Sequence, residues 1–131
     1  MEIRILLVDD EADFVETMAK RFRIRKITVA PAYSGVEALK LMDEQDFDVV
    51  ILDVRMPGMD GLEVLRQIRL KRPLTEVIML TGHASLDAGM QGMNLGAYDY
   101  VLKPADFDEL LDKVRRAAER KALNVRAQAK G

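Results

Sequence analysis

The sequence contains no cysteine and only one histidine among its 131 residues. Without cysteine, disulfide bonds and thiolate metal sites are excluded. No apolar run approaches the length of a membrane span, and the amino terminus lacks the organisation of a signal peptide. The 22 acidic and 20 basic residues leave a net charge of -2, which favours neither a nucleic-acid surface nor a membrane surface. We therefore expect a cytoplasmic protein that binds neither nucleic acid nor membrane directly.

What the sequence has instead is a series of short apolar runs, each followed by a segment with helical spacing of apolar residues. Residues 49–52 are apolar throughout, as expected for a strand buried on both faces of a parallel sheet. Similar runs occur at residues 3–8, 27–30, 77–80 and 98–102. Five strands that alternate with five helices predict one three-layer α/β/α domain with a doubly wound, five-stranded parallel sheet. Right-handed crossovers favour the flavodoxin-like strand order 2-1-3-4-5.

Capping residues indicate where the helices begin. The stretch SGVE at residues 34–37 is a capping box, in which the serine caps the helix and the glutamate reaches back. The other expected caps are Asp10, Asp60, Ser85 and Asp106. The fourth helix, expected over residues 85–95, contains Gly89 and Gly92, each of which costs ~1 kcal/mol of helix stability relative to alanine. These glycines either permit close packing or leave this helix easily shifted.

Polar residues follow four of the five predicted strands. Asp9 and Asp10 follow the first, Asp53 ends the third, Thr81 follows the fourth, and Lys103 follows the fifth. Because the carboxyl ends of parallel strands lie along one edge of the sheet, we expect these side chains to converge there. A single acid at this edge can be a nucleophile, a ligand or an ordinary turn residue. A capping role alone explains Asp10, but it explains neither Asp9 nor Asp53.

Three converging carboxylates repel one another, and one takes up a proton unless a cation lies among them. A hard divalent cation prefers oxygen ligands, and magnesium needs only one or two carboxylates together with a phosphate oxygen. Lys103 suits a phosphate as a point charge, and the Thr81 hydroxyl offers it a hydrogen bond. Asp53 is then a candidate nucleophile toward phosphorus, forming a mixed anhydride. The pattern indicates phosphoryl transfer, which needs little beyond in-line placement and neutralised oxygens.

Four motifs, each placed after an apolar run, carry a family resemblance: VDDE, ILDVRMPGMDG, LTGHA and DYVLKP. In this order they make the chain, from Ile3 through about Ala118, resemble the receiver domain of two-component response regulators, of the chemotaxis-regulator type. The resemblance implies that Asp53 is the phospho-acceptor. It also implies that Mg²⁺ or Mn²⁺ is held by Asp53 together with three further groups: the side chains of Asp9 and Asp10 and the backbone carbonyl of Arg55.

The same resemblance assigns the phosphate-binding and switching residues. Thr81, Gly82 and Lys103 would bind the phosphoryl group. Thr81 and Tyr100 would act as the switch, the tyrosine rotating into the space behind the threonine. The bond between Lys103 and Pro104 would be a cis peptide.

The resemblance implies a signalling switch that promotes only its own phosphorylation and dephosphorylation, and not a conventional enzyme. The donor would be a sensor histidine kinase or a phosphotransfer protein. The surface of the fourth helix, fifth strand and fifth helix would change to control an output domain or protein target, and would offer a homodimer contact. Alternatives are a phosphate-relay intermediate or the N-terminal regulatory fragment of a transcriptional regulator. We expect residues 1–119 to form the receiver domain and residues 120–131 a basic helix extension or linker stub.

Two other classes of protein fit the sequence less well. A flavodoxin-type mononucleotide binder shares the fold but needs a phosphate-cradling loop after the first strand, where this chain has Asp9-Asp10-Glu11. An aspartyl-phosphate hydrolase typically has a second aspartate two residues after the first, and Arg55 occupies that position. The single histidine, His83, is expected to be a loop residue and neither a phosphodonor nor a metal ligand.

Overall fold

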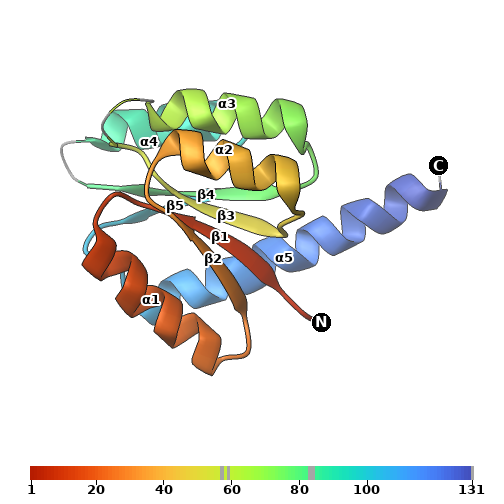
Figure 1. Cartoon of the computed structure of the whole chain (residues 1–131). Helices are drawn as coiled ribbons and strands as arrows, with labels where there is room; N and C mark the ends of the chain where they lie inside the picture. The colour runs from red at the N-terminus through yellow and green to blue at the C-terminus, as the bar shows by residue number, and fades with distance from the viewer. Residues whose placement is uncertain (57, 59, 83–84, 131) are drawn as a thin grey trace.

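The computed structural model describes residues 1–56, 58, 60–82 and 85–130. These residues form five strands and five helices in alternation along the chain, arranged as Figure 1 shows. The strands are β1 (Arg4–Val8), β2 (Thr28–Ala32), β3 (Val49–Asp53), β4 (Glu76–Thr81) and β5 (Asp99–Leu102). The helices are α1 (Ala12–Ile24), α2 (Gly35–Glu44), α3 (Gly61–Lys71), α4 (Leu86–Asn94) and α5 (Phe107–Lys130). Among the described residues, no helix is both long and apolar enough to span a bilayer.

All strand pairs are parallel, and the strand order is β2-β1-β3-β4-β5. Helices α1 and α5 cover one face of the sheet, while α2, α3 and α4 cover the other (Figure 1). The predicted three-layer, doubly wound fold with strand order 2-1-3-4-5 is confirmed.

The central strands are buried on both faces because their side chains alternate between two apolar cores. In β3, Val49 and Ile51 belong to the core under α1 and α5, whereas Val50 and Leu52 belong to the core under α2 and α3. Strands β1 and β4 alternate in the same way. This explains why these segments are apolar runs without polar alternation, and it leaves their polar residues at the strand ends.

Most of the predicted caps are observed. Ser34 Oγ accepts a hydrogen bond from the Glu37 amide at 3.1 Å. Asp60 accepts from the Leu62 amide at 2.8 Å, and Asp106 accepts from the Glu109 amide at 3.1 Å. These bonds satisfy amide groups that the first turn of a helix otherwise leaves without partners.

Two expected caps are wrong in detail. The residue before α1 is Glu11 rather than Asp10, and it makes no side-chain cap bond. The Asp9 carboxylate instead accepts from the Glu11 amide at 3.0 Å, so the acid ahead of Asp10 holds this turn. Ser85 does precede α4, but its side chain makes no capping bond.

Helix α5 is longer than its apolar packing requires. Its fully buried residues end at Ala118, yet the helix continues without a break to Lys130. The boundary expected between residues 119 and 120 therefore lies inside a continuous helix. In Figure 1 the end of α5 projects beyond the sheet.

Candidate functional site

Three aspartates meet at the carboxyl edge of the sheet. The parallel register places Val8 beside Leu52, so Asp9 at the end of β1 lies next to Asp53 at the end of β3. Asp9 is fully buried, Asp53 is 7% exposed, and Asp10 is exposed. Each of the three offers a carboxylate oxygen, and these oxygens all lie within 4.8 Å of one another. This is the oxygen donor set that Mg²⁺ and Mn²⁺ prefer.

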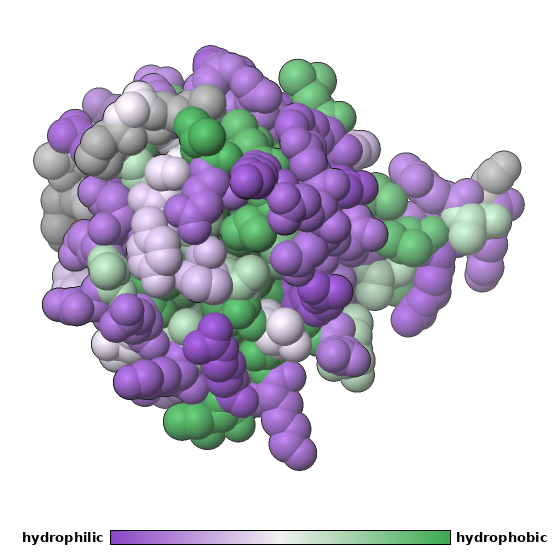
Figure 2. Space-filling model, in the orientation of Figure 1, coloured by the Kyte–Doolittle hydropathy of each residue, from purple (hydrophilic) through white to green (hydrophobic). Residues whose placement is uncertain are grey.

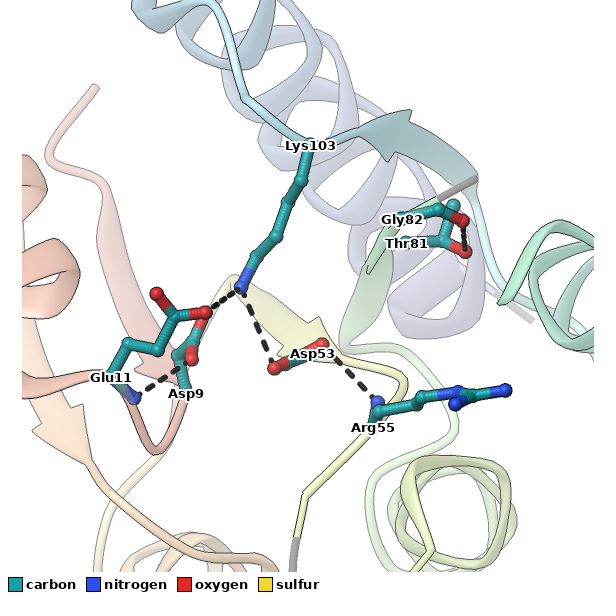
Figure 3. A network of polar contacts seen from close by, with 7 residues as sticks. All are labelled: Asp9, Glu11, Asp53, Arg55, Thr81, Gly82 and Lys103. Carbon is teal, nitrogen blue, oxygen red and sulfur yellow. Dashed lines mark hydrogen bonds and ion pairs between the residues drawn. The ribbon is translucent and has the colours of Figure 1, made fainter. Parts of the chain in front are cut away.

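Lys103 reaches into this group from the end of β5 (Figure 3). Its Nζ lies 2.7 Å from Asp9 Oδ2, 3.5 Å from Asp53 Oδ2 and 3.1 Å from Glu11 Oε1. The same ammonium lies 4.9 Å from the centroid of the Phe14 ring, which is within the range of a cation–π contact. The peptide bond from Lys103 to Pro104 is cis. The lysine thus joins segments that are distant in sequence around one pocket.

The pKa values of Asp53 and Lys103 are both shifted by their surroundings in the pocket. Burial and the neighbouring Asp9 charge raise the pKa of Asp53 to about 6, although Lys103 and the Arg55 amide act in the opposite direction. Burial alone would lower the pKa of Lys103, but the hydrogen bond to Asp9 and the charges of Asp53 and Asp9 outweigh it and raise that pKa. The ammonium of Lys103 therefore offsets only part of the cost of burying the Asp53 carboxylate beside Asp9.

Thr81 lies at the same edge, but its hydroxyl does not point at the acids. Thr81 Oγ1 donates to the Ser85 carbonyl oxygen at 2.8 Å and lies 3.2 Å from the Gly82 carbonyl oxygen. Figure 3 shows the Thr81 hydroxyl turned away from Asp53. A Cβ added at Gly82 would meet no atom within 4 Å, so this residue leaves the space beside the threonine open.

Two further residues near the site are Tyr100 on β5 and Gly89 on α4. Tyr100 is half-buried on β5 against the core under α2 and α3. Its carbonyl oxygen accepts from Lys113 Nζ of α5 at 2.9 Å. Gly89 lies directly against Thr81, since an added Cβ would be 3.2 Å from Thr81 Cγ2. Close packing is therefore one reason for the glycine at this position of α4.

Two amide hydrogen bonds hold the described residues on either side of the segment between β3 and α3. The Arg55 amide donates to Asp53 Oδ1 at 3.2 Å, and the Gly61 amide donates to the Val54 carbonyl oxygen at 3.2 Å. A Cβ at Gly61 would lie 2.6 Å from that same oxygen, so only glycine fits there. His83 and its expected loop role lie outside the described residues.

Sequence reasoning missed three contributors to the site. Glu11 forms an ion pair with Lys103. Its position directly after the two aspartates could have indicated this contact. Phe14 contacts the lysine through its ring, and Gly61 abuts the backbone after Asp53. These two contacts depend on how helices dock on the sheet, which helical periodicity alone does not specify.

Comparison with known proteins gives a consistent assignment. Residues 5–115 match the profile of the "Response regulator receiver domain" family. The regulatory protein AtoC of Escherichia coli is 37% identical over 92% of this chain, which spans 26% of that protein. A receiver domain protein from Clostridium thermocellum aligns with a TM-score of 0.89 and 35% identity, over 92% of this chain and 98% of that chain.

Part of a longer solved structure is also similar to this chain over its full length. The NtrX structure from Brucella abortus aligns with a TM-score of 0.91 and 28% identity, over 100% of this chain and 30% of that chain. The chain thus spans about a quarter of the length of AtoC and under a third of that NtrX chain.

Proposed function

Because this chain belongs to the response regulator receiver domain family, we propose that it is a signalling switch that accepts a phosphoryl group on Asp53. The observation that carries the proposal is the convergence of three aspartates and one lysine at a single edge of the sheet. Receiver domains are signalling switches and generally not enzymes. This one would promote only its own phosphorylation and dephosphorylation.

The residues present fit a divalent cation. The side chains of Asp9, Asp10 and Asp53 offer clustered oxygens, and burial, together with the neighbouring Asp9 charge, raises the pKa of Asp53. We propose Mg²⁺ or Mn²⁺ as the ion, with the Arg55 backbone carbonyl as a further ligand. When bound, the ion would neutralise charge on the aspartates and on the incoming phosphoryl oxygens.

Asp53 would act as the nucleophile. One of its oxygens would form a bond to phosphorus as the bond from phosphorus to the donor breaks, leaving an aspartyl phosphate. Lys103, already 3.5 Å from Asp53, would pair with a phosphoryl oxygen. Gly82, which has no side chain, would leave space for the phosphoryl group at the mouth of the pocket.

Thr81 and Tyr100 would convert this chemistry into a change of shape. The Thr81 hydroxyl would leave the Ser85 carbonyl, to which it now donates at 2.8 Å, and donate to a phosphoryl oxygen instead. Tyr100 would rotate into the space behind it. The bond that Thr81 gives up lies at the first turn of α4, so the change would spread to the surface formed by α4, β5 and α5.

The partners follow from this role. The phosphoryl donor would be a sensor histidine kinase or a phosphotransfer protein in the cytoplasm. The α4-β5-α5 surface would control an output domain or a separate target, and would offer a contact between two copies of the chain. A regulatory segment of a longer transcriptional regulator is favoured over a relay intermediate, because AtoC, at 37% identity, is a regulatory protein of which this chain spans 26%. We propose no direct contact with nucleic acid or membrane.

The acceptor assignment is tested by intact mass after incubation with a small acyl phosphate and Mg²⁺. The protein should gain the mass of one phosphoryl group, and chelation of the metal with EDTA should abolish the gain. Asp53→Asn should gain nothing, whereas Asp46→Asn, which removes an exposed acid that pairs with Arg72 away from the site, should behave as the parent does. An adduct that survives in Asp53→Asn would refute the assignment.

A further inference from the structure

A second cluster of charged residues lies at the amino edge of the sheet, where the strands begin. Its centre is Glu76, the first residue of β4, which is 5% exposed. Two arginines approach its carboxylate: Arg120 Nε of α5 at 3.0 Å and Arg69 Nη1 of α3 at 3.8 Å. None of these groups belongs to the phosphoryl site, which occupies the carboxyl ends of the strands.

A buried carboxylate at this position is unfavourable by itself. Burial raises the pKa of Glu76, and the charges of Arg120 and Arg69 counteract only part of that effect. Its Oε2, although close to Arg120, has no hydrogen-bond partner of good geometry among the described residues. An acid at this position therefore lowers the stability of the domain, and its contacts with the two arginines offset only part of that cost.

Asp48 supplies a second acid beside Glu76. It is tied to the sheet from two sides, since its Oδ2 accepts from the Arg4 amide at 2.8 Å and its carbonyl oxygen accepts from the Glu76 amide at 3.2 Å. Its other oxygen, Oδ1, accepts from Lys121 Nζ of α5 at 3.2 Å. Two consecutive basic residues of α5 are thus bound to two acids that the sheet holds in place.

These contacts begin where the apolar packing of α5 ends. Ala118 is the last fully buried residue of the helix, and Arg120 and Lys121 follow after one exposed residue. From residue 125 onward every described side chain of α5 is exposed. In Figure 2 this end projects from the body of the molecule, with hydrophilic and hydrophobic residues side by side. A helical end of this length is marginal in water without anchoring.

We propose that Glu76 and Asp48 form a clasp, together with Arg120 and Lys121, that orders the distal part of α5 and fixes the direction in which it leaves the domain. Any segment joined to the end of α5 would then be held at a defined orientation to the receiver fold. The whole of this chain, including the distal helix, aligns with part of the longer NtrX chain. The clasp acts whether or not Asp53 carries a phosphoryl group, so it does not rest on the acceptor assignment.

The clasp is tested by pulsed electron resonance distances, without any phosphoryl donor. Because the chain has no cysteine, labels on introduced Glu44→Cys and Gln128→Cys report only the separation of α2 and the distal helix. The parent should give one narrow distance distribution. In a variant that combines Arg120→Gln and Lys121→Gln, the distribution should broaden, and amide exchange over residues 122–130 should become about fivefold faster. Glu76→Gln, with nearly unchanged shape, should broaden the distribution partly.

The matched control is Arg116→Gln, because Arg116 lies on the same helix and pairs only with Asp112 one turn away among the contacts described. It should leave both the distances and the exchange as in the parent. Amide exchange of β4 should stay much slower than that of residues 122–130 in every variant, which shows that the domain stays folded. An unaltered distribution in the Arg120→Gln and Lys121→Gln variant, or equal broadening in the control, would overturn the proposal.

Discussion

Replacing Asp53 with asparagine is expected to change how stability depends on pH. Burial and the Asp9 charge raise the pKa of Asp53 from 3.8 to about 6. Below about pH 4 the folded and unfolded states both hold this proton, and it has little effect on stability. As the pH rises, the unfolded state loses the proton first, so the stability of the parent falls. The full loss is reached above the folded-state pKa, near neutral pH.

The magnitude follows from the two pKa values. The difference between 3.8 and about 6 corresponds to about 3 kcal/mol, at about 1.36 kcal/mol for each pH unit. Asp53→Asn does not ionise at this position. Its free energy of unfolding should therefore exceed that of the parent by about 3 kcal/mol at pH 8, and by less than about 1 kcal/mol at pH 4.

The assay is urea unfolding followed by circular dichroism, in EDTA, at several values between pH 4 and pH 8. Glu119→Gln, which removes an exposed acid of α5, controls for general charge effects and should follow the parent. Mg²⁺ added in excess over the EDTA should stabilise the parent at pH 8 and narrow its gap to Asp53→Asn, because the ion should bind the folded carboxylates. A gap that stays constant across this range, or that reverses its sign, would refute the electrostatic reasoning.

Three further substitutions test the packing and the switch. Gly61→Ala places a Cβ 2.6 Å from the Val54 carbonyl oxygen, and should lower the free energy of unfolding by about 1–3 kcal/mol in urea titrations; parental stability would contradict the predicted clash. Lys103→Met should still accept phosphate in part, as read by intact mass, but should lose the phosphorylation-dependent change in amide exchange of α4; a parental change in α4 would argue against the role given to the lysine. Gly89→Ala places a Cβ 3.2 Å from Thr81 Cγ2, a contact tight enough to restrict movement of the Thr81 side chain, so phosphorylation should alter the amide exchange of α4 less than in the parent; an alteration as large as in the parent would contradict this.

The sequence predicted the fold well because its apolar pattern matches the burial of each strand. The run at residues 49–52 is apolar throughout because both faces of β3 are covered, and Asp53 follows because the strand ends at the edge of the core. The same reasoning predicted that Asp9 and Lys103 lie at one edge of the sheet. In the structure Lys103 Nζ lies 2.7 Å from Asp9 Oδ2. The carboxyl ends of parallel strands lie at one edge of the sheet, so the position of a residue at the end of a predicted strand was sufficient to place it there.

What the sequence did not predict depends on contacts between distant segments. The Thr81 hydroxyl bonds the Ser85 carbonyl, and no pattern specifies that rotamer. The fourth strand was predicted to begin at residue 77, which left Glu76 outside it. In the structure Glu76 is the first residue of β4, and it pairs with an arginine of α3 and an arginine of α5. From the sequence alone such an acid is expected at the surface, because its basic partners lie at distant and unrelated positions of the chain.

If Asp53 is the phospho-acceptor, the phosphoryl group should be on this residue and on no neighbouring acid. Borohydride reduces an acyl phosphate to an alcohol, and so converts the acceptor aspartate into homoserine, which peptide mass mapping locates. After phosphorylation in Mg²⁺ and reduction, we expect homoserine at position 53 alone. Homoserine at position 9 or 10, or its absence from the phosphorylated protein, would contradict it.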